Sequence, residues 1–348
     1  MRLDNIFIDS IGVRLGQPID LAEAVADGRY DADEYTANGL LQAVVADGEF
    51  APDMAVAAVQ QAMARSSVAA ADIRLILHAS LYFQGQDMWT PASYIQQRTI
   101  GGHASSVEVD QKSNGGLAAL ALAVAYLSAC PDDAAVLVTT GDRFCLPGWD
   151  RFRSETGTVM GDGATATVLT RRPGLGRVLS TVLVADPTLV EMYRGEGLRP
   201  ERAPADRPLD LRARKKKYMR RNMRNLEEIS DRLAGGVRDC ILEALAEAKT
   251  ELSDVRRVVL PNIGLTVRWW RLLREMGVGA ERTTWDWGRT IGHLGAGDQA
   301  NGLHHLIRTG AVAPGDRVVL AGSGHGFNWG AAVVEIVSTP AWAGSDDR

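Results

Sequence analysis

Ser113 is the first candidate for chemistry in this chain, because it lies where a predicted strand meets a predicted helix. It follows the short apolar run 107–109 and precedes Asn114-Gly115-Gly116, which opens the apolar segment 115–130. Backbone N–H groups at the start of such a helix point toward whatever the hydroxyl attacks, and the helix dipole favours negative charge there. Ser113 is therefore predicted to be a nucleophile in acyl transfer, if another segment supplies a base. The alternative is that Ser113 only caps the helix.

A histidine and an aspartate lie five residues apart in the glycine-rich segment 290–298. We predict that His293 takes the proton of the serine hydroxyl, and that Asp298 holds the imidazole in the useful tautomer. The alternatives are a buried structural histidine and an aspartate that caps the helix beginning at 297 or 298.

A second glycine-rich segment, 322–330, contains His325 and Gly326. Its backbone N–H groups can approach a ligand closely. Neither glycine-rich segment is a phosphate loop, because Gly-Lys-Ser/Thr is absent and no GxGxxG connects a strand to a helix.

The elements that position these residues alternate between apolar strands and helices, which predicts a largely parallel sheet covered on both faces. The predicted strands are 73–80, 107–109, 134–140, 163–170, 255–260, 316–321 and 330–337, and the predicted helices are 52–65, 114–130, 226–248 and 297–309. The strands that begin at Gly163 and Gly330 are similar in sequence, and each follows a glycine-rich turn. This similarity indicates an internal duplication.

Length and composition limit the class of protein. The chain has 348 residues, of which 46% are hydrophobic, so it can form two domains or one duplicated unit. A formal net charge of -5 argues against a general nucleic-acid-binding protein. The N-terminus has no signal-peptide pattern and the segment 115–130 is too short to span a membrane, so a cytoplasmic protein is expected. Three cysteines without CxxC spacing argue against a disulfide framework or a zinc site.

The segment 186–225 interrupts the alternation with four prolines and a dense basic run, and is predicted to be a surface cap. The basic run is either a solvated helix face or a docking surface for an acidic carrier protein or for coenzyme A phosphates. A nucleic-acid-binding site is the least favoured interpretation of the basic run, because no recognition fold accompanies it. The candidate docking residues are Arg214, Lys215, Lys216, Arg220 and Arg221.

Four segments together resemble the ketoacyl synthase III branch of the thiolase superfamily, in order and in separation. They are the serine turn before Asn114-Gly115-Gly116, the segment Gly161-Asp162-Gly163-Ala164, the loop around His293, and the closing Gly326-Phe327-Asn328-Trp329-Gly330. The resemblance covers nearly the whole chain and implies an α/β, thiolase-like five-layer α-β-α-β-α fold of two duplicated halves, assembled as a homodimer. The halves are 1–172, with the nucleophile, and 173–348, with the His/Asp pair and the basic cap.

Three departures from the condensing members of that family change the expected chemistry. Ser113 stands at the position that resembles the family's cysteine, Asn262 follows Pro261 where the family has histidine, and His293 stands where it has asparagine. Carbon–carbon condensation needs two neutral donors that hold the enolate oxygen, and this pair is not preserved. A Ser-His-Asp set instead resembles an acyltransferase.

The segment 77–93 and the Ser113 turn resemble a subgroup, the ketoacyl synthase III-like acyltransferases of antibiotic pathways. The resemblance implies transfer of an acyl or aryl group from a carrier protein or coenzyme A thioester, through acyl-Ser113, to a hydroxyl or amine of a small acceptor. The N–H groups of Gly326 and Ser113 are predicted to form the oxyanion hole, with His325 nearby. Asn262 either donates a hydrogen bond to substrate or caps a turn. No metal or redox cofactor is implied.

Two other functions remain open from the sequence. One is a starter-unit priming or condensing ketosynthase III of a polyketide pathway, which would release carbon dioxide from a malonyl thioester. The other is a non-catalytic partner that only binds acyl carrier protein.

Overall fold

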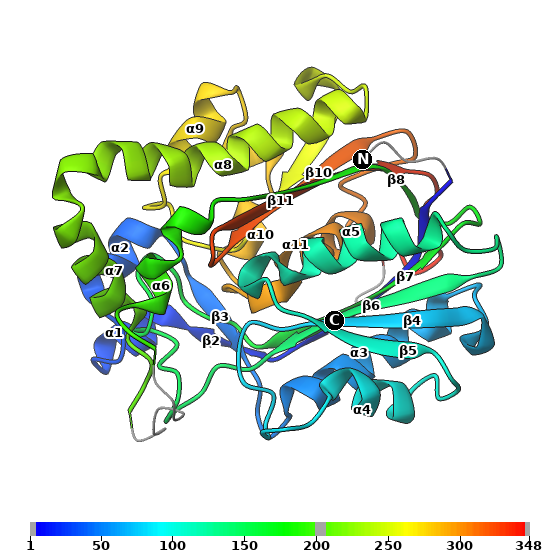
Figure 1. Cartoon of the computed structure of the whole chain (residues 1–348), viewed down its shortest axis with the longest axis horizontal. Coiled ribbons are helices and arrows are strands. Elements are labelled where there is room, and N and C mark those ends of the chain that lie inside the picture. The colour runs from blue at the N-terminus through cyan, green and yellow to red at the C-terminus, as the bar shows by residue number, and fades with distance from the viewer. Residues whose placement is uncertain (1–4, 199–206, 345–348) are drawn as a thin grey trace.

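Among the described residues, nine strands form one mixed sheet through the middle of the molecule, in the order β5-β4-β6-β7-β1-β8-β11-β10-β9 (Figure 1). The computed structural model describes residues 5–198 and 207–344. The strands are β1 (Phe7–Leu15), β4 (Ile73–Ala79), β5 (Ser105–Val109), β6 (Ala135–Asp142), β7 (Gly163–Thr170), β8 (Gly176–Ala185), β9 (Val255–Val259), β10 (Arg317–Gly324) and β11 (Asn328–Ile336). A separate ribbon pairs β2 (Gln17–Asp20) with β3 (Gln42–Val45).

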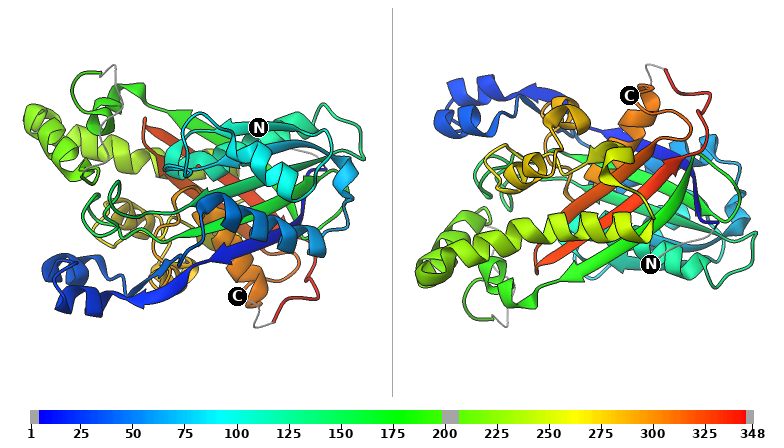
Figure 2. Two further views of the ribbon diagram at one scale, coloured as in Figure 1. Left: turned by 90° about the horizontal axis from the view of Figure 1, so that it is seen from below. Right: turned by 90° about the horizontal axis from the view of Figure 1, so that it is seen from above.

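Helices form three layers around and between the two halves of this sheet. The helices α5 (Gly115–Leu127) and α11 (Asp298–Arg308) lie between the halves, and α5 contacts strands of both. Outer faces are covered by α3 (Ala51–Arg65) and α4 (Pro91–Arg98) on one side and by α8 (Leu226–Glu247) on the other (Figure 2). The shorter helices are α1 (Leu21–Ala26), α2 (Ala32–Asn38), α6 (Glu191–Arg194), α7 (Leu211–Arg221), α9 (Trp269–Glu275) and α10 (Trp285–Gly288).

The side-chain pattern explains the layers. Helix α5 is built almost entirely of Gly, Ala, Leu and Val, as expected for a helix buried between two sheets. Helix α8 carries charged residues on one side and buries Ala234, Val237 and Ile241 on the other, so it covers a single sheet face. The predicted five-layer α-β-α-β-α arrangement is confirmed.

The strand pairing repeats between the halves. In the first half β7 pairs antiparallel with β1 and β6, and β6 pairs parallel with β4. In the second half β11 pairs antiparallel with β8 and β10, and β10 pairs parallel with β9. The helix before β6 is α5 and the helix before β10 is α11, so these two helices occupy equivalent places. The predicted duplication is confirmed, while the boundary between residues 172 and 173 stays a prediction.

The prediction of a largely parallel sheet is wrong. Most strand pairs are antiparallel, because β6 returns through a loop to β7, and β10 turns directly into β11, without a crossover helix. The strands β1 and β8, which join the halves, were not predicted. Strand β1 contains Asp9, Ser10 and Gly12 and therefore lacks a continuous apolar run, although all three are buried.

The segment 186–225 contains α6, α7 and short turns, and several of its residues line the same pocket as Ser113, while its role as a cap stays a prediction. Its residues 199–206, including Pro200 and Pro204, lie outside the described residues. Across the described ranges, no helix combines the length and the apolar character that crossing a membrane requires.

Candidate active site

Ser113, His293 and Asp298 form a hydrogen-bonded chain. The Nδ1 atom of His293 lies 2.5 Å from Oδ2 of Asp298, and its Nε2 atom lies 2.8 Å from Oγ of Ser113. An ionised carboxylate only accepts hydrogen bonds, so Nδ1 donates its hydrogen to Asp298 and Nε2 is left to accept the serine hydrogen. All three side chains are buried. His293 therefore contacts Ser113 on one side and Asp298 on the other, in the order that serine activation requires.

Backbone geometry at two equivalent helix starts brings the three residues together. Ser113 lies in a short turn, Lys112–Asn114, that leads into α5, and Asp298 is the first residue of α11. Lys112 has a φ of 53°, in the left-handed region that residues with a side chain rarely adopt. The chain thus turns sharply directly before Ser113, between β5 and α5.

Two glycines permit the close packing at this point. A Cβ atom on Gly116 would lie 2.4 Å from the carbonyl oxygen of Ala296, and one on Gly324 would lie 2.0 Å from that of Gln111. Any other residue at these positions would separate the serine turn from the histidine loop or from the end of β10. The glycine-rich composition of all three segments is thus a packing requirement of the site.

Asn262 holds the acid rather than facing the pocket. Its backbone N–H donates to Asp298 Oδ2 (3.1 Å), and its side-chain amide donates to Asp298 Oδ1 (3.1 Å) and to the Gly292 carbonyl (3.1 Å). Leu294 donates a further backbone N–H to Asp298 Oδ1 (2.9 Å). Both amide hydrogens of Asn262 are thus used to position Asp298 and its loop, and a hydrogen bond from Asn262 to substrate stays a prediction.

A pocket of about 440 Å³ opens onto Ser113 and His293. Its walls come from the loop 150–158 between β6 and β7, from the cap, from α8, and from the loop after β9. Apolar side chains dominate the walls, among them Leu81, Trp149, Met160, Met192, Trp269 and Phe327. A volume of this size holds one small ligand at a time.

The turn between β10 and β11 contributes His325 to the pocket wall, and Gly326 follows it. The ring of His325 stacks on Tyr193 with centroids 3.5 Å apart. Burial, with a smaller effect from the charge of Lys215, lowers the pKa of His325 to about 3, so the ring is neutral. The oxyanion role of Gly326 stays a prediction.

The five candidate docking residues divide into two groups. Lys216, Arg220 and Arg221 are exposed on α7, where a carrier can reach them. Arg214 instead donates to the Tyr193 carbonyl (2.8 Å), and Lys215 points into the pocket and pairs with Glu155 (2.9 Å). Lys215 is therefore a pocket residue, and the docking role of the candidate residues stays a prediction.

Sequence reasoning missed the polar side chains at the pocket's far wall and one buried acid behind the site. Glu155 and Tyr193 belong to no motif, and only the fold brings them near Lys215. Asp142, at the end of β6, accepts backbone hydrogen bonds from Tyr82 (2.8 Å) and Ala296 (3.1 Å). Burial raises the pKa of Asp142 to about 7.

No group of three or more His, Cys, Asp or Glu side chains with a metal-binding arrangement occurs among the residues that the structure describes.

Comparison with known proteins identifies the family. The model of the 3-oxoacyl-[acyl-carrier-protein] synthase III C-terminal family matches residues 245–336. A β-ketoacyl-[acyl-carrier-protein] synthase III of Clostridium beijerinckii is 22% identical over 339 residues, covering 96% of this chain and all of that protein. A solved structure of the priming β-ketosynthase of the R1128 polyketide pathway has a TM-score of 0.75 at 20% identity, over 97% of this chain and 98% of its own.

A solved structure of ChlB3, described as an acyltransferase, is more similar. It has a TM-score of 0.90 and 33% sequence identity, and the match covers 97% of this chain and 100% of ChlB3. Identity at this level over the whole length, together with the shared fold and the C-terminal family match, establishes common membership. The chain belongs to the ketoacyl synthase III-like family of the thiolase superfamily.

Proposed function

We propose that this protein is an acyltransferase that carries the acyl group as an ester of Ser113. One observation carries the proposal: the continuous hydrogen-bonded chain from Ser113 through His293 to Asp298, at the end of a pocket. A serine hydroxyl needs such a base, whereas the cysteine of a condensing enzyme does not need an acid-backed histidine at this place.

In the first half-reaction Ser113 Oγ attacks the carbonyl carbon of an acyl thioester while its proton moves to His293 Nε2. Asp298 stabilises the resulting imidazolium through Nδ1. The tetrahedral oxyanion faces the N–H groups of Ser113 and Gly326, which are its proposed donors. As the carbon–sulfur bond breaks, His293 returns the proton to the leaving thiolate, and the acyl-Ser113 ester remains.

In the second half-reaction an acceptor hydroxyl or amine replaces the thiol in the pocket. His293 Nε2 takes its proton as it attacks the ester carbonyl, and then protonates Ser113 Oγ when the ester bond breaks. The pocket volume supports this ping-pong order, since about 440 Å³ accommodates one substrate at a time.

The similarity to ChlB3 supports an acyltransferase over other chemistry within the family. We infer that the donor is a thioester of a carrier protein or of coenzyme A, and that an acidic carrier docks at Lys216, Arg220 and Arg221. The proposed protein is a cytoplasmic homodimer of a secondary-metabolite pathway.

Intact-protein mass spectrometry tests the covalent step. After incubation with a set of acyl thioesters, the wild type is expected to gain the mass of one acyl group and Ser113→Ala none. Equal labelling of both proteins, or no adduct with any thioester, overturns the proposal.

Condensation is the second candidate, and the names of the relatives favour it. The site argues against it, because the amide of Asn262 donates to Asp298 and Gly292 and so does not serve as one of the two enolate donors that condensation needs. Release of labelled carbon dioxide from a malonyl thioester would favour the condensing enzyme, and its absence the transferase.

A further inference from the structure

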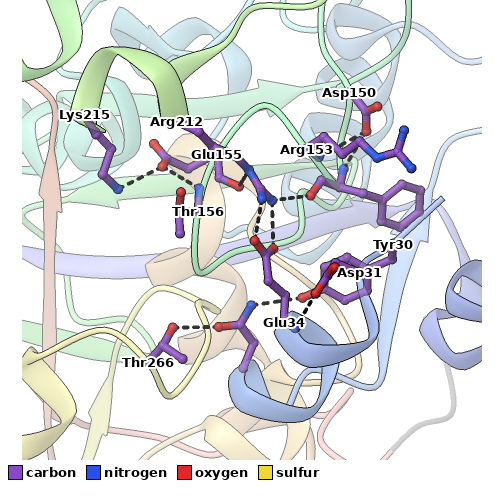
Figure 3. Close-up of polar contacts among 12 residues, drawn as sticks. Tyr30, Asp31, Glu34, Asp150, Arg153, Glu155, Thr156, Arg212, Lys215 and Thr266 are labelled. Atoms are coloured by element: carbon purple, nitrogen blue, oxygen red, sulfur yellow. Dashed lines mark hydrogen bonds and ion pairs between the residues drawn. The ribbon is translucent and has the colours of Figure 1, made fainter. Parts of the chain in front are cut away.

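A buried polar cluster lies in the same pocket as Ser113 but takes no part in the serine, histidine and aspartate chain. Its centre is Glu155, whose side chain is 10% exposed. Oε1 of Glu155 accepts hydrogen bonds from Lys215 Nζ (2.9 Å) and from the Thr156 backbone N–H (2.6 Å), as Figure 3 shows. The phenol of Tyr193 lies close enough to influence both Glu155 and Lys215, but it makes no hydrogen bond to Glu155 Oε2. The cluster therefore joins the loop 150–158 to the cap.

The second carboxylate oxygen of Glu155 lacks a donor. Oε2 is buried, and no group among the described residues meets it in hydrogen-bonding geometry. A buried acceptor without a donor is costly, and such groups are uncommon in folded proteins. Glu155 lines the pocket, and apolar side chains such as Leu81, Met192 and Phe327 line the same space. The missing donor is therefore expected to come from a ligand.

Contacts with other segments hold the Glu155 backbone in place, so its carboxylate can recognise a ligand from a fixed position. Arg212 of α7 donates to the carbonyl oxygens of Glu155 (2.9 Å) and Phe152 (2.7 Å). The same guanidinium pairs with Glu34 of α2, with one N–H to Oε2 at 2.8 Å. Figure 3 shows Arg212 between Glu34 and the loop that carries Glu155. Two separate segments thus fix the backbone on which the free carboxylate oxygen stands.

The charges around Glu155 favour a neutral donor. Burial disfavours the charge of Lys215, but Tyr193 and Glu155 outweigh it and raise the pKa of Lys215, so the lysine is charged. The Lys215 ammonium group already pairs with Glu155 Oε1. An ammonium ion placed at Oε2 would meet Lys215 nearby, whereas a hydroxyl would complete the acceptor without added charge.

We propose that Glu155 Oε2 accepts a hydrogen bond from a non-reacting hydroxyl of the acceptor, which is therefore a molecule with an apolar body and at least one hydroxyl besides the group that is acylated. This inference rests on the proposed function. The thioester arm and the acceptor use the pocket in turn, because both must reach Ser113. The two half-reactions therefore distinguish a role toward the acceptor from a role toward the arm.

For the test, the enzyme is first loaded from an acyl N-acetylcysteamine thioester to form acyl-Ser113. It is then incubated with three sets of probes of equal chain length: 1-alkanols, alkane-1,ω-diols and ω-amino-1-alkanols. At the best chain length, ester formation with the diol is expected to be about tenfold faster than with the alkanol, and the amino alcohol is expected to fall below the diol. This comparison needs no variant. Equal use of diols and alkanols overturns the assignment.

A double variant, Glu155→Met with Lys215→Met, removes both partners together, because removing Glu155 alone would leave a buried unpaired charge. Measured from acyl-Ser113 enzyme that has already formed, the diol preference of this variant is expected to fall to about one. The matched control changes an exposed pair of the same cap, Glu196→Met with Lys217→Met, and keeps the preference.

Two results for the double variant overturn the inference. An undiminished diol preference removes Glu155 from acceptor recognition, and a loss of Ser113 acylation assigns it to the thioester arm or to the fold. Failure of the proposed function gives a different result from both. In that case mass spectrometry detects no acyl-Ser113 on the wild type, before any acceptor is added.

Discussion

The role expected for Asn262 from the sequence differs from the role that the structure indicates. Its position after Pro261 resembles that of a catalytic histidine, which made substrate binding plausible. The structure places its amide against Asp298 and the Gly292 carbonyl. Asn262 therefore acts through Asp298, as a positioning residue, and the reacting atoms lie one contact further away.

Substitution of Asn262 separates these two roles. Asn262→Ala is expected to lower kcat about tenfold with an unchanged KM for the thioester, since a loosened Asp298 weakens the base without touching the substrate. The free energy of unfolding is expected to fall by about 1–3 kcal/mol, because the buried Gly292 carbonyl loses its donor. Steady-state kinetics and urea titration measure both. A raised KM with unchanged kcat would restore the substrate-binding role.

Asp142 makes the stability of the fold depend on pH. Burial raises its folded pKa to about 7 from an ordinary value of 3.8, so the folded state holds an extra proton between these values. The contribution is present below pH 4 and is lost as pH rises through 7. Relative to Asp142→Asn, the wild type is expected to lose up to about 4 kcal/mol of unfolding free energy across this window. Parallel urea titrations at several pH values check this, and identical pH profiles would contradict it.

At the scale of elements, the site is the meeting of two equivalent helix starts. Ser113 leads into α5 and Asp298 begins α11, and the strand pairing gives these helices the same place in the two halves. The duplication thus presents one helix start from each half to the same pocket. One start supplies the nucleophile and the other the acid and, through the preceding loop, the base.

Gly116 tests how closely the two helix starts must approach. Gly116→Ala would place a Cβ atom 2.4 Å from the Ala296 carbonyl oxygen, so the loop that carries His293 must move away from Ser113. We expect at least a hundredfold loss of acylation rate in a protein that still folds, because nucleophile and base lose contact. Acylation rates and circular dichroism give the two readouts.

The matched control lies in α8. A Cβ atom on Gly235 would have its nearest contact, 3.4 Å, with the flexible Arg238 side chain. Gly235→Ala is expected to raise the free energy of unfolding by about 0.5–1 kcal/mol and to leave acylation unchanged. Normal acylation by Gly116→Ala would show that the close approach is not needed.

At the scale of the whole molecule, β5 is a strand at an open edge of the sheet. It is the first strand in the sheet order, pairs only with β4, and carries Val107 with 43% of its surface exposed. Open edge strands pair readily with another chain. The homodimer expected from the family resemblance is therefore predicted to form along β5.

A charge on this strand is expected to disrupt that assembly. Val107→Lys should shift the protein from dimer to monomer in light scattering at micromolar concentration, because two lysines would oppose each other across the interface. Leu242→Lys on α8, an equally exposed apolar residue away from the edge, is the control and should stay dimeric. A monomeric wild type, or a dimeric Val107→Lys, contradicts the prediction.

The sequence by itself determined the local structure. Helical periodicity located α3 and α8 to within a residue or two, and a strand rich in β-branched residues located β7 at its observed ends. It also determined that His293 and Asp298 share one loop and that Ser113 precedes a helix. These features depend on hydrogen bonds and burial between near neighbours in the chain, which a pattern of residue types records.

Tertiary structure decided the direction of the strands, the contact between Ser113 and His293 across 180 residues of chain, and the pocket cluster around Glu155. Each depends on which distant surfaces pack together. Glu155 and Lys215 lie 60 residues apart and belong to no motif. From the sequence alone, Glu155 on its loop and Lys215 in the basic run are each expected to be solvated side chains. The fold brings the cap against the loop that carries Glu155 and leaves Glu155 Oε2 buried without a donor.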